Sequence, residues 1–136
     1  MNKLYKLSAF YAVLGMAGGV FFREFTKLQG FDGVTSLGVV HTHAFMLGMM
    51  FFLVVLILEK LFALSTQKNF LRFLYIYNIG LLIAIVMLFA RGIPQVLNIT
   101  LASGMNSAIS GIAGIGHILI CIGLFYFFKI LKQQTK

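Results

Sequence analysis

The three histidines of this chain all lie within long apolar stretches, where an ionisable side chain usually has a function. His41 and His43 lie near the start of the second stretch, and His117 lies nine residues after Ala108, where the fourth begins. At a rise of about 1.5 Å per helical residue, these depths agree to within one or two turns if the two helices are parallel. Two imidazoles can then meet at one level of a bilayer.

The number of available ligands limits which metal such a pair can hold. His41 and His43 are two residues apart, so they point about 200° apart on a helix and cannot bind one ion together. A zinc or mononuclear copper site takes three or four protein ligands, and Cys121 is the only cysteine. An iron already held by four porphyrin nitrogens needs only two axial histidines. The ligand inventory therefore predicts haem b, bound by His117 and one histidine of the second stretch.

Neighbouring residues fit a flat macrocycle. Phe45 and Gly48 share a helical face with His41, and Gly114 lies one turn before His117, which leaves room for a porphyrin. Arg23 and Arg91 end the first and third stretches and are expected to pair with the haem propionates.

Each of these features also has a purely structural interpretation. The glycines and the aromatic ring can serve helix packing, and the arginines can be ordinary interfacial residues. Each imidazole can simply bond to a backbone carbonyl and hold the bundle together.

Composition defines the elements that must position these residues. Of the 136 residues, 60% are hydrophobic and only 10% are charged, against about 25% charged in soluble domains. We therefore expect an integral membrane protein with an all-α fold, a four-helix bundle forming a single domain over residues 1–136. We expect each of these helices to cross the hydrocarbon layer of a membrane, which is about 30 Å thick. The expected spans are 7–22, 36–58, 73–90 and 108–128.

Charge placement predicts the topology and excludes some chemistry. The two tails and the middle loop hold eight Lys and Arg, whereas the first and third loops hold three, so both termini are expected to be cytoplasmic. The net charge of +8 therefore indicates orientation in the membrane rather than nucleic-acid binding. No span contains a carboxylate, which excludes paired-carboxylate catalysis and an intramembrane acidic proton relay. Segment 91–107 is expected to contain a short helix or an ordered loop.

The stretch from His41 to Gly48 resembles the second transmembrane helix of subunit I of the haem–copper oxidases, whose low-spin haem ligand opens a similar His-Thr-x-Ala sequence. By position, this resemblance implies that His41 is the axial ligand, with His43 as the alternative. The whole chain also resembles a small bacterial membrane family, domain of unknown function 2871, which implies the bacterial cytoplasmic membrane but no activity. The stretches that carry this second resemblance are 20–27, 41–43 and 111–117.

These observations favour a b-type haem protein with bis-histidine ligation by His41 and His117, acting in one-electron transfer or haem-based sensing. Its expected partners are membrane lipid, a quinone or a membrane oxidoreductase, and further copies of itself. Oxygen reduction by this chain alone is not expected, because an oxidase binuclear centre needs more histidines than three. The alternative is a cofactor-free membrane scaffold or accessory subunit. A small transporter ranks last, because few polar residues are available to line a path.

Overall fold

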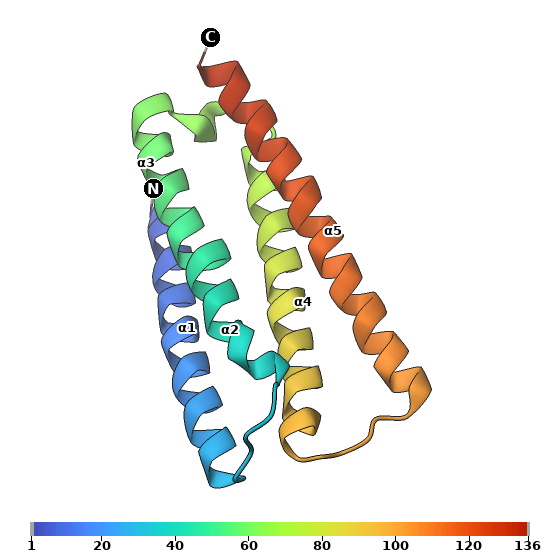
Figure 1. The fold of residues 1–136 in the computed structure, drawn as a ribbon. Helices are drawn as coiled ribbons and strands as arrows, with labels where there is room; N and C mark the ends of the chain where they lie inside the picture. The colour runs from blue at the N-terminus through green and yellow to red at the C-terminus, as the bar shows by residue number, and fades with distance from the viewer. Residues whose placement is uncertain (1, 136) are drawn as a thin grey trace.

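Four long helices, each antiparallel to the next, make up the computed structural model, which describes residues 2–135 (Figure 1). The first is α1 (Asn2–Leu28), the third is α4 (Phe70–Val96) and the fourth is α5 (Ser103–Gln134). The second runs over Ser36–Phe62 and changes its winding along its length. Its consecutive segments are η1 (Ser36–Val39), α2 (Val40–Thr42), η2 (His43–Met50) and α3 (Phe51–Phe62).

All four helices are long and apolar enough to cross a membrane, with mean hydropathies of 1.3, 2.3, 2.3 and 2.1 over their most apolar windows. The predicted all-α, four-helix fold is thus confirmed over the described residues. Helices one, three and four extend beyond both ends of their predicted spans, and the second extends past its C-terminal end, because polar end residues continue the helical backbone. Met1 and Lys136, which complete the predicted domain, lie outside the described residues.

Segment 91–107 is mostly helical, unlike the separate connection expected there. The helix α4 continues through Pro94 to Val96, and α5 already begins at Ser103. Asn98, with a φ of 54°, takes the left-handed conformation just after α4 ends. Only residues 97–102 therefore form the loop, and they include no helix of their own.

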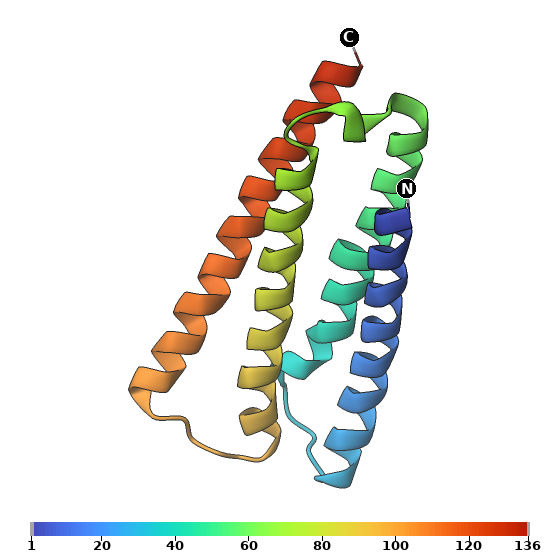
Figure 2. The same ribbon diagram turned by 180° about the vertical axis from the view of Figure 1, so that it is seen from behind.

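The helices pack as two pairs, α1 with the second helix and α4 with α5, as both ribbon views show (Figures 1 and 2). Both termini lie at one end of the bundle, and the loops around 29–35 and 97–102 lie at the other. That arrangement agrees with an even number of crossings. The end of the bundle that holds the two termini also carries most of the Lys and Arg residues.

An aromatic cluster joins the two pairs near the middle of the bundle. Phe51 stacks on Tyr77 with ring centres 4.4 Å apart, and its ring centre lies 5.4 Å from that of Phe127. Tyr11 brings α1 into the same cluster by stacking on Phe52 at 5.8 Å. Such pairs contribute about 0.5–1.5 kcal/mol each beyond area burial. They matter here because lipid tails leave no hydrophobic driving force between helices, so specific packing must hold them.

The contact between α4 and α5 depends on glycine. A Cβ added at Gly80 would lie 2.7 Å from the Gly116 carbonyl oxygen and 2.8 Å from the Ile120 amide nitrogen, both backbone atoms that cannot move aside. Gly111 on the same α5 helix has nothing within 4 Å of such a Cβ. The two backbones therefore approach closely because residue 80 has no side chain, and Gly116 and Gly123 of α5 lie equally close to α4.

Replacing Gly80 by alanine is expected to push α5 away from α4 and to destabilise the protein by about 1–3 kcal/mol, a typical cost of overpacking. Gly111→Ala is the matched control and should be neutral or stabilising by about 0.5–1 kcal/mol, because it only restricts the unfolded chain. Thermal unfolding in mild detergent, followed by circular dichroism, measures both. Equal stability of the two variants would contradict the close helix contact.

Candidate functional site

The histidine motif lies at a change of helix type. Residues His43–Met50 form a π-helix, η2, between the short α2 segment and α3. Such segments are rare and are often found at functional sites. A π-turn is wider than an α-turn, so residues after His43 are rotated relative to the 3.6-residue period that the sequence analysis assumed. No simple periodicity in the sequence indicates this change.

Side chains from two other helices hold the π-helix in place. The Tyr77 hydroxyl of α4 donates a hydrogen bond to the Leu47 carbonyl at 2.8 Å, and the Ser8 hydroxyl of α1 donates one to the Met49 carbonyl at 3.0 Å. Gly48 lies directly against Tyr11, whose ring a Cβ would meet at 2.3 Å. These contacts fix the turns that follow His43.

His43 and His117 meet across the bundle. Their ring centres are 6.4 Å apart and their planes are nearly perpendicular, at 89°. The Nδ1 atom of His43 is 2.8 Å from the Val39 carbonyl oxygen, and that of His117 is 2.7 Å from the Ala113 carbonyl oxygen. A carbonyl only accepts, so each Nδ1 carries a proton, and in the neutral imidazole each Nε2 then keeps its lone pair. This is the tautomer that binds metals through Nε2, oriented by a backbone hydrogen bond.

The ring separation fits two imidazoles on opposite sides of one metal ion. A histidine nitrogen lies about 2.0–2.1 Å from its metal and about 1.1 Å from its own ring centre, which places such ring centres about 6.2–6.4 Å apart. The observed separation is 6.4 Å. Within residues 2–135, no three His, Cys, Asp or Glu side chains lie close enough to hold an ion together. A metal held by this pair would therefore need further ligands that these side chains do not supply.

His41 lies in a different environment, against α1. Its ring contacts Phe45, with ring centres 6.4 Å apart, and a Cβ added at Gly19 would lie 3.7 Å from its Cβ. The Nδ1 atom of His41 is buried and has no hydrogen-bond partner among the described residues. The structure thus brings His43, the predicted alternative, to His117 and places His41 at the interface with α1.

The residues expected to line a porphyrin separate into two groups. Phe45 packs over Gly15 of α1, where an added Cβ would meet its ring at 2.7 Å, and Gly48 packs against Tyr11 as described above. Helix packing therefore accounts for both. Gly114 is exposed, with nothing within 4 Å of an added Cβ, so it leaves open space one turn from His117.

The two arginines also differ. The Nη2 atom of Arg91 donates to the Ser110 hydroxyl of α5 at 2.5 Å, and its Nε is buried with no partner among the described residues. Ser110 precedes His117 by seven residues, a rise of about 10 Å along the helix. Arg23 is 81% exposed and lies 3.7 Å from Glu24, to which it forms a surface ion pair. Arg91 therefore has donor capacity directed to the histidine side of the bundle, whereas Arg23 faces the surroundings.

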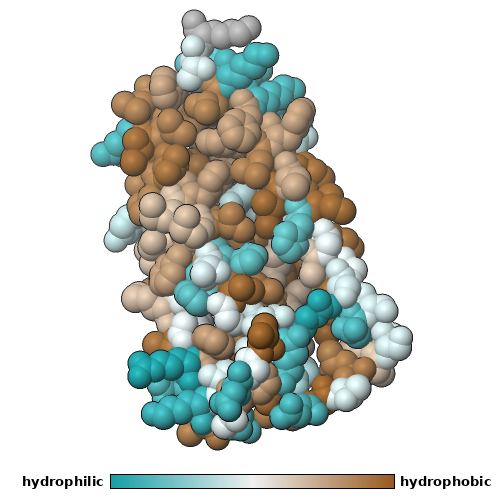
Figure 3. All heavy atoms as spheres, viewed as in Figure 1, coloured by the Kyte–Doolittle hydropathy of each residue, from teal (hydrophilic) through white to brown (hydrophobic). Residues whose placement is uncertain are grey.

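The outer surface agrees with a membrane environment. Figure 3 shows mostly hydrophobic side chains over the helices, and hydrophilic side chains gathered at both ends of the bundle. A few hydrophilic side chains also interrupt the apolar surface part-way along the face between the second helix and α5. His117 is exposed and His43 is half-buried. The histidine pair is thus reachable from outside the bundle rather than enclosed.

Comparison with known proteins gives one match. The sequence profile of the family described as Protein of unknown function (DUF2871) matches residues 1–134. The chain belongs to this family. No curated protein and no solved structure matches the chain, so the comparisons do not support the resemblance to the haem–copper oxidases. The function of this DUF2871 protein must therefore be argued from its histidine pair.

The pairing of His43 with His117 can be tested without any cofactor. With Cys121 replaced by serine, His43→Cys/His117→Cys should be linked efficiently by a bis-maleimide long enough to replace the two imidazole rings, since the two side chains face each other. His41→Cys/His117→Cys is the matched control and should link at least about tenfold more slowly, because residue 41 faces α1. Mass spectrometry of the intact protein measures linkage. Faster linkage of the 41/117 pair would contradict the arrangement.

Proposed function

We propose that this protein binds haem b between the second helix and α5, with His43 and His117 as axial ligands, and that it carries single electrons within the membrane. The observation that carries the proposal is the perpendicular imidazole pair, 6.4 Å between ring centres, with both Nδ1 atoms bonded to backbone carbonyls. When bound, the haem supplies a one-electron iron couple. The chain supplies the ligands, their orientation and the apolar surroundings.

The choice of His43 over His41 follows from packing. The oxidase resemblance marks His41, but that imidazole is packed against α1 and lies beside Gly19 and Phe45. His43 has its Nδ1 bonded and its Nε2 free, on the side of the helix that meets α5. We therefore assign the ligand role to His43 and a packing role to His41.

The surrounding residues suit a redox cofactor. A backbone carbonyl that accepts from Nδ1–H makes each imidazole a stronger electron donor, which favours the ferric iron and lowers the reduction potential. Arg91, with an unpartnered Nε and its position near Ser110, is the side chain best placed to pair with a propionate. Arg23 is a weaker candidate, because it is exposed and already beside Glu24.

Electron transfer fits this site better than gas sensing. Both imidazoles are held in orientation by hydrogen bonds of 2.7–2.8 Å to backbone carbonyls. A gas that displaced either histidine from the iron would have to compete with a ligand that is already aligned. The electron partners that we propose are a membrane quinone or a membrane oxidoreductase, which can approach the exposed side of His117. A second copy of the chain is the further candidate to cover that open face.

A cofactor-free scaffold or accessory subunit is the second candidate function. The observation that favours it is that each imidazole of the pair is already bonded to the carbonyl of its own helix. Such bonds stabilise the side chains without any metal. This alternative predicts a colourless protein that tolerates loss of either histidine.

Absorption spectra of protein purified in mild detergent from haem-replete cells test the proposal. We expect a Soret band, and a sharp α-band after reduction by dithionite, both lost in His43→Ala and in His117→Ala because each removes an axial ligand. His41→Ala is the matched control and should keep at least about nine-tenths of the haem, since it removes only a packing side chain. Absence of a Soret band even after adding haem would favour the scaffold. Loss of haem in His41→Ala, with His43→Ala unaffected, would refute our ligand assignment.

A further inference from the structure

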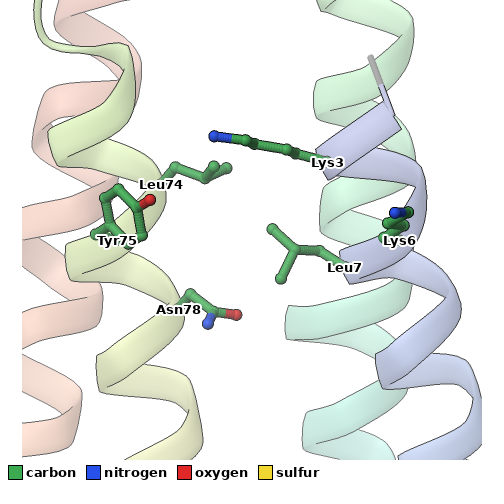
Figure 4. A pocket seen from close by; sticks show the side chains of 6 residues that line it. All are labelled: Lys3, Lys6, Leu7, Leu74, Tyr75 and Asn78. Atoms are coloured by element: carbon green, nitrogen blue, oxygen red, sulfur yellow. The ribbon is translucent and has the colours of Figure 1, made fainter.

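A second candidate site lies between α1 and α4, at the end of the bundle that holds the termini. Here α1 and α4 leave a cleft of about 290 Å³ between them. Figure 4 shows its side chains: Leu7 points from α1 toward α4, and Lys3 extends across the opening. In Figure 2 the same two helices are those nearest the viewer. The lining residues are Lys3, Lys6, Leu7, Leu74, Tyr75 and Asn78.

The chemistry of the cleft changes along its length. Its walls are mostly apolar, with Leu74 buried and Leu7 half-buried. Two exposed cations line it, Lys3 across the opening and Lys6 over α1 (Figure 4), and none of the six described residues that line it is acidic. An occupant must therefore combine an apolar chain with a negatively charged group.

A polar pair at the inner end of the cleft is held in a fixed orientation. The Tyr11 hydroxyl donates to the Asn78 Oδ1 atom at 2.7 Å, and Figure 4 shows this oxygen directed toward α1. The Asn78 amide nitrogen has no partner among the described residues, so its two hydrogens are available as donors. Tyr75 adds a hydroxyl and is 58% exposed. Donors at this depth suit the ester carbonyls of a lipid, below its headgroup.

The position in the bundle agrees with the chemistry. The cleft opens at the cation-rich end, which the distribution of Lys and Arg assigns to the cytoplasmic side. Basic pockets between transmembrane helices on that side are typical binding sites for anionic lipid headgroups. Two lysines match a phosphate, whereas the uncharged head of a quinone would gain little from them.

We infer that the cleft between α1 and α4 binds one anionic glycerophospholipid. Lys3 and Lys6 bind its phosphate, the Asn78 amide and the Tyr75 hydroxyl donate to the glycerol ester region, and an acyl chain lies along Leu7 and Leu74. The site is independent of the histidine pair, since it uses the other side of the bundle. A lipid here would join the free end of α1 to α4.

Native mass spectrometry of the detergent-solubilised protein, titrated with phosphatidylglycerol or phosphatidylcholine of the same acyl chains, tests this inference. The wild-type protein should bind one phosphatidylglycerol about tenfold more tightly than phosphatidylcholine, and Lys3→Gln/Lys6→Gln should abolish that preference. Both lysines are exposed, so this variant should fold normally. The matched control, Lys129→Gln/Lys132→Gln, removes two exposed cations of α5 and should retain the preference.

A second variant separates the cleft from general surface charge. Leu7→Trp fills the cleft and leaves both lysines in place, so it should abolish the single tight binding event for phosphatidylglycerol. Equal loss in the control pair, or no preference in the wild-type protein, would overturn the inference. Tight binding of phosphatidylglycerol that persists in Leu7→Trp would also overturn the inference. Displacement of the phospholipid by a quinone, unchanged by loss of the lysines, would instead assign the cleft to a quinone.

Discussion

The hydrogen bond from the Tyr77 hydroxyl to the Leu47 carbonyl, 2.8 Å long, is the interaction on which the proposed site depends most. It joins α4 to the π-helical segment that begins at His43 and therefore fixes how that segment is rotated. Gly123 of α5 packs directly on the Cβ and backbone of Tyr77, where an added Cβ would lie 2.7–3.0 Å away. Tyr77 thus contacts the second helix through its hydroxyl and α5 through its backbone.

A membrane makes such specific contacts more important than they are in water. Lipid tails are as apolar as leucine side chains, so the helices gain little by hiding apolar surface from them. Two kinds of contact stabilise the association of the helices instead of the hydrophobic effect. They are the close backbone approach at Gly80 and the interhelical hydrogen bonds of Ser8, Tyr11 and Tyr77. The polar groups of the chain are consequently few, and most of them have partners. Among the described residues, the buried side-chain atoms without a partner are the Nδ1 of His41 and the Nε of Arg91.

The sequence was sufficient to predict the four helices, because long apolar runs have only one stable form in lipid. It also indicated that a histidine of the second helix would lie level with His117, since rise per residue is nearly constant. Through the oxidase resemblance it favoured His41, whereas the structure brings His43 to His117. That choice depends on the π-helix of residues 43–50 and on the contacts of His41 with α1, both of which arise from packing between helices. The cleft between α1 and α4 could not be predicted from the sequence either, because its lining residues come from distant parts of the chain.

Electron paramagnetic resonance of the oxidised, haem-loaded protein at low temperature tests the central claim most directly. Two axial imidazoles with planes 89° apart are expected to give ferric iron a low-spin, strongly anisotropic spectrum, because perpendicular ligand planes leave two iron d orbitals nearly equal in energy. His41→Ala should leave that spectrum unchanged. A high-spin spectrum, a rhombic spectrum typical of parallel imidazoles, or protein that takes up no haem would contradict ligation by His43 and His117 as they are arranged here.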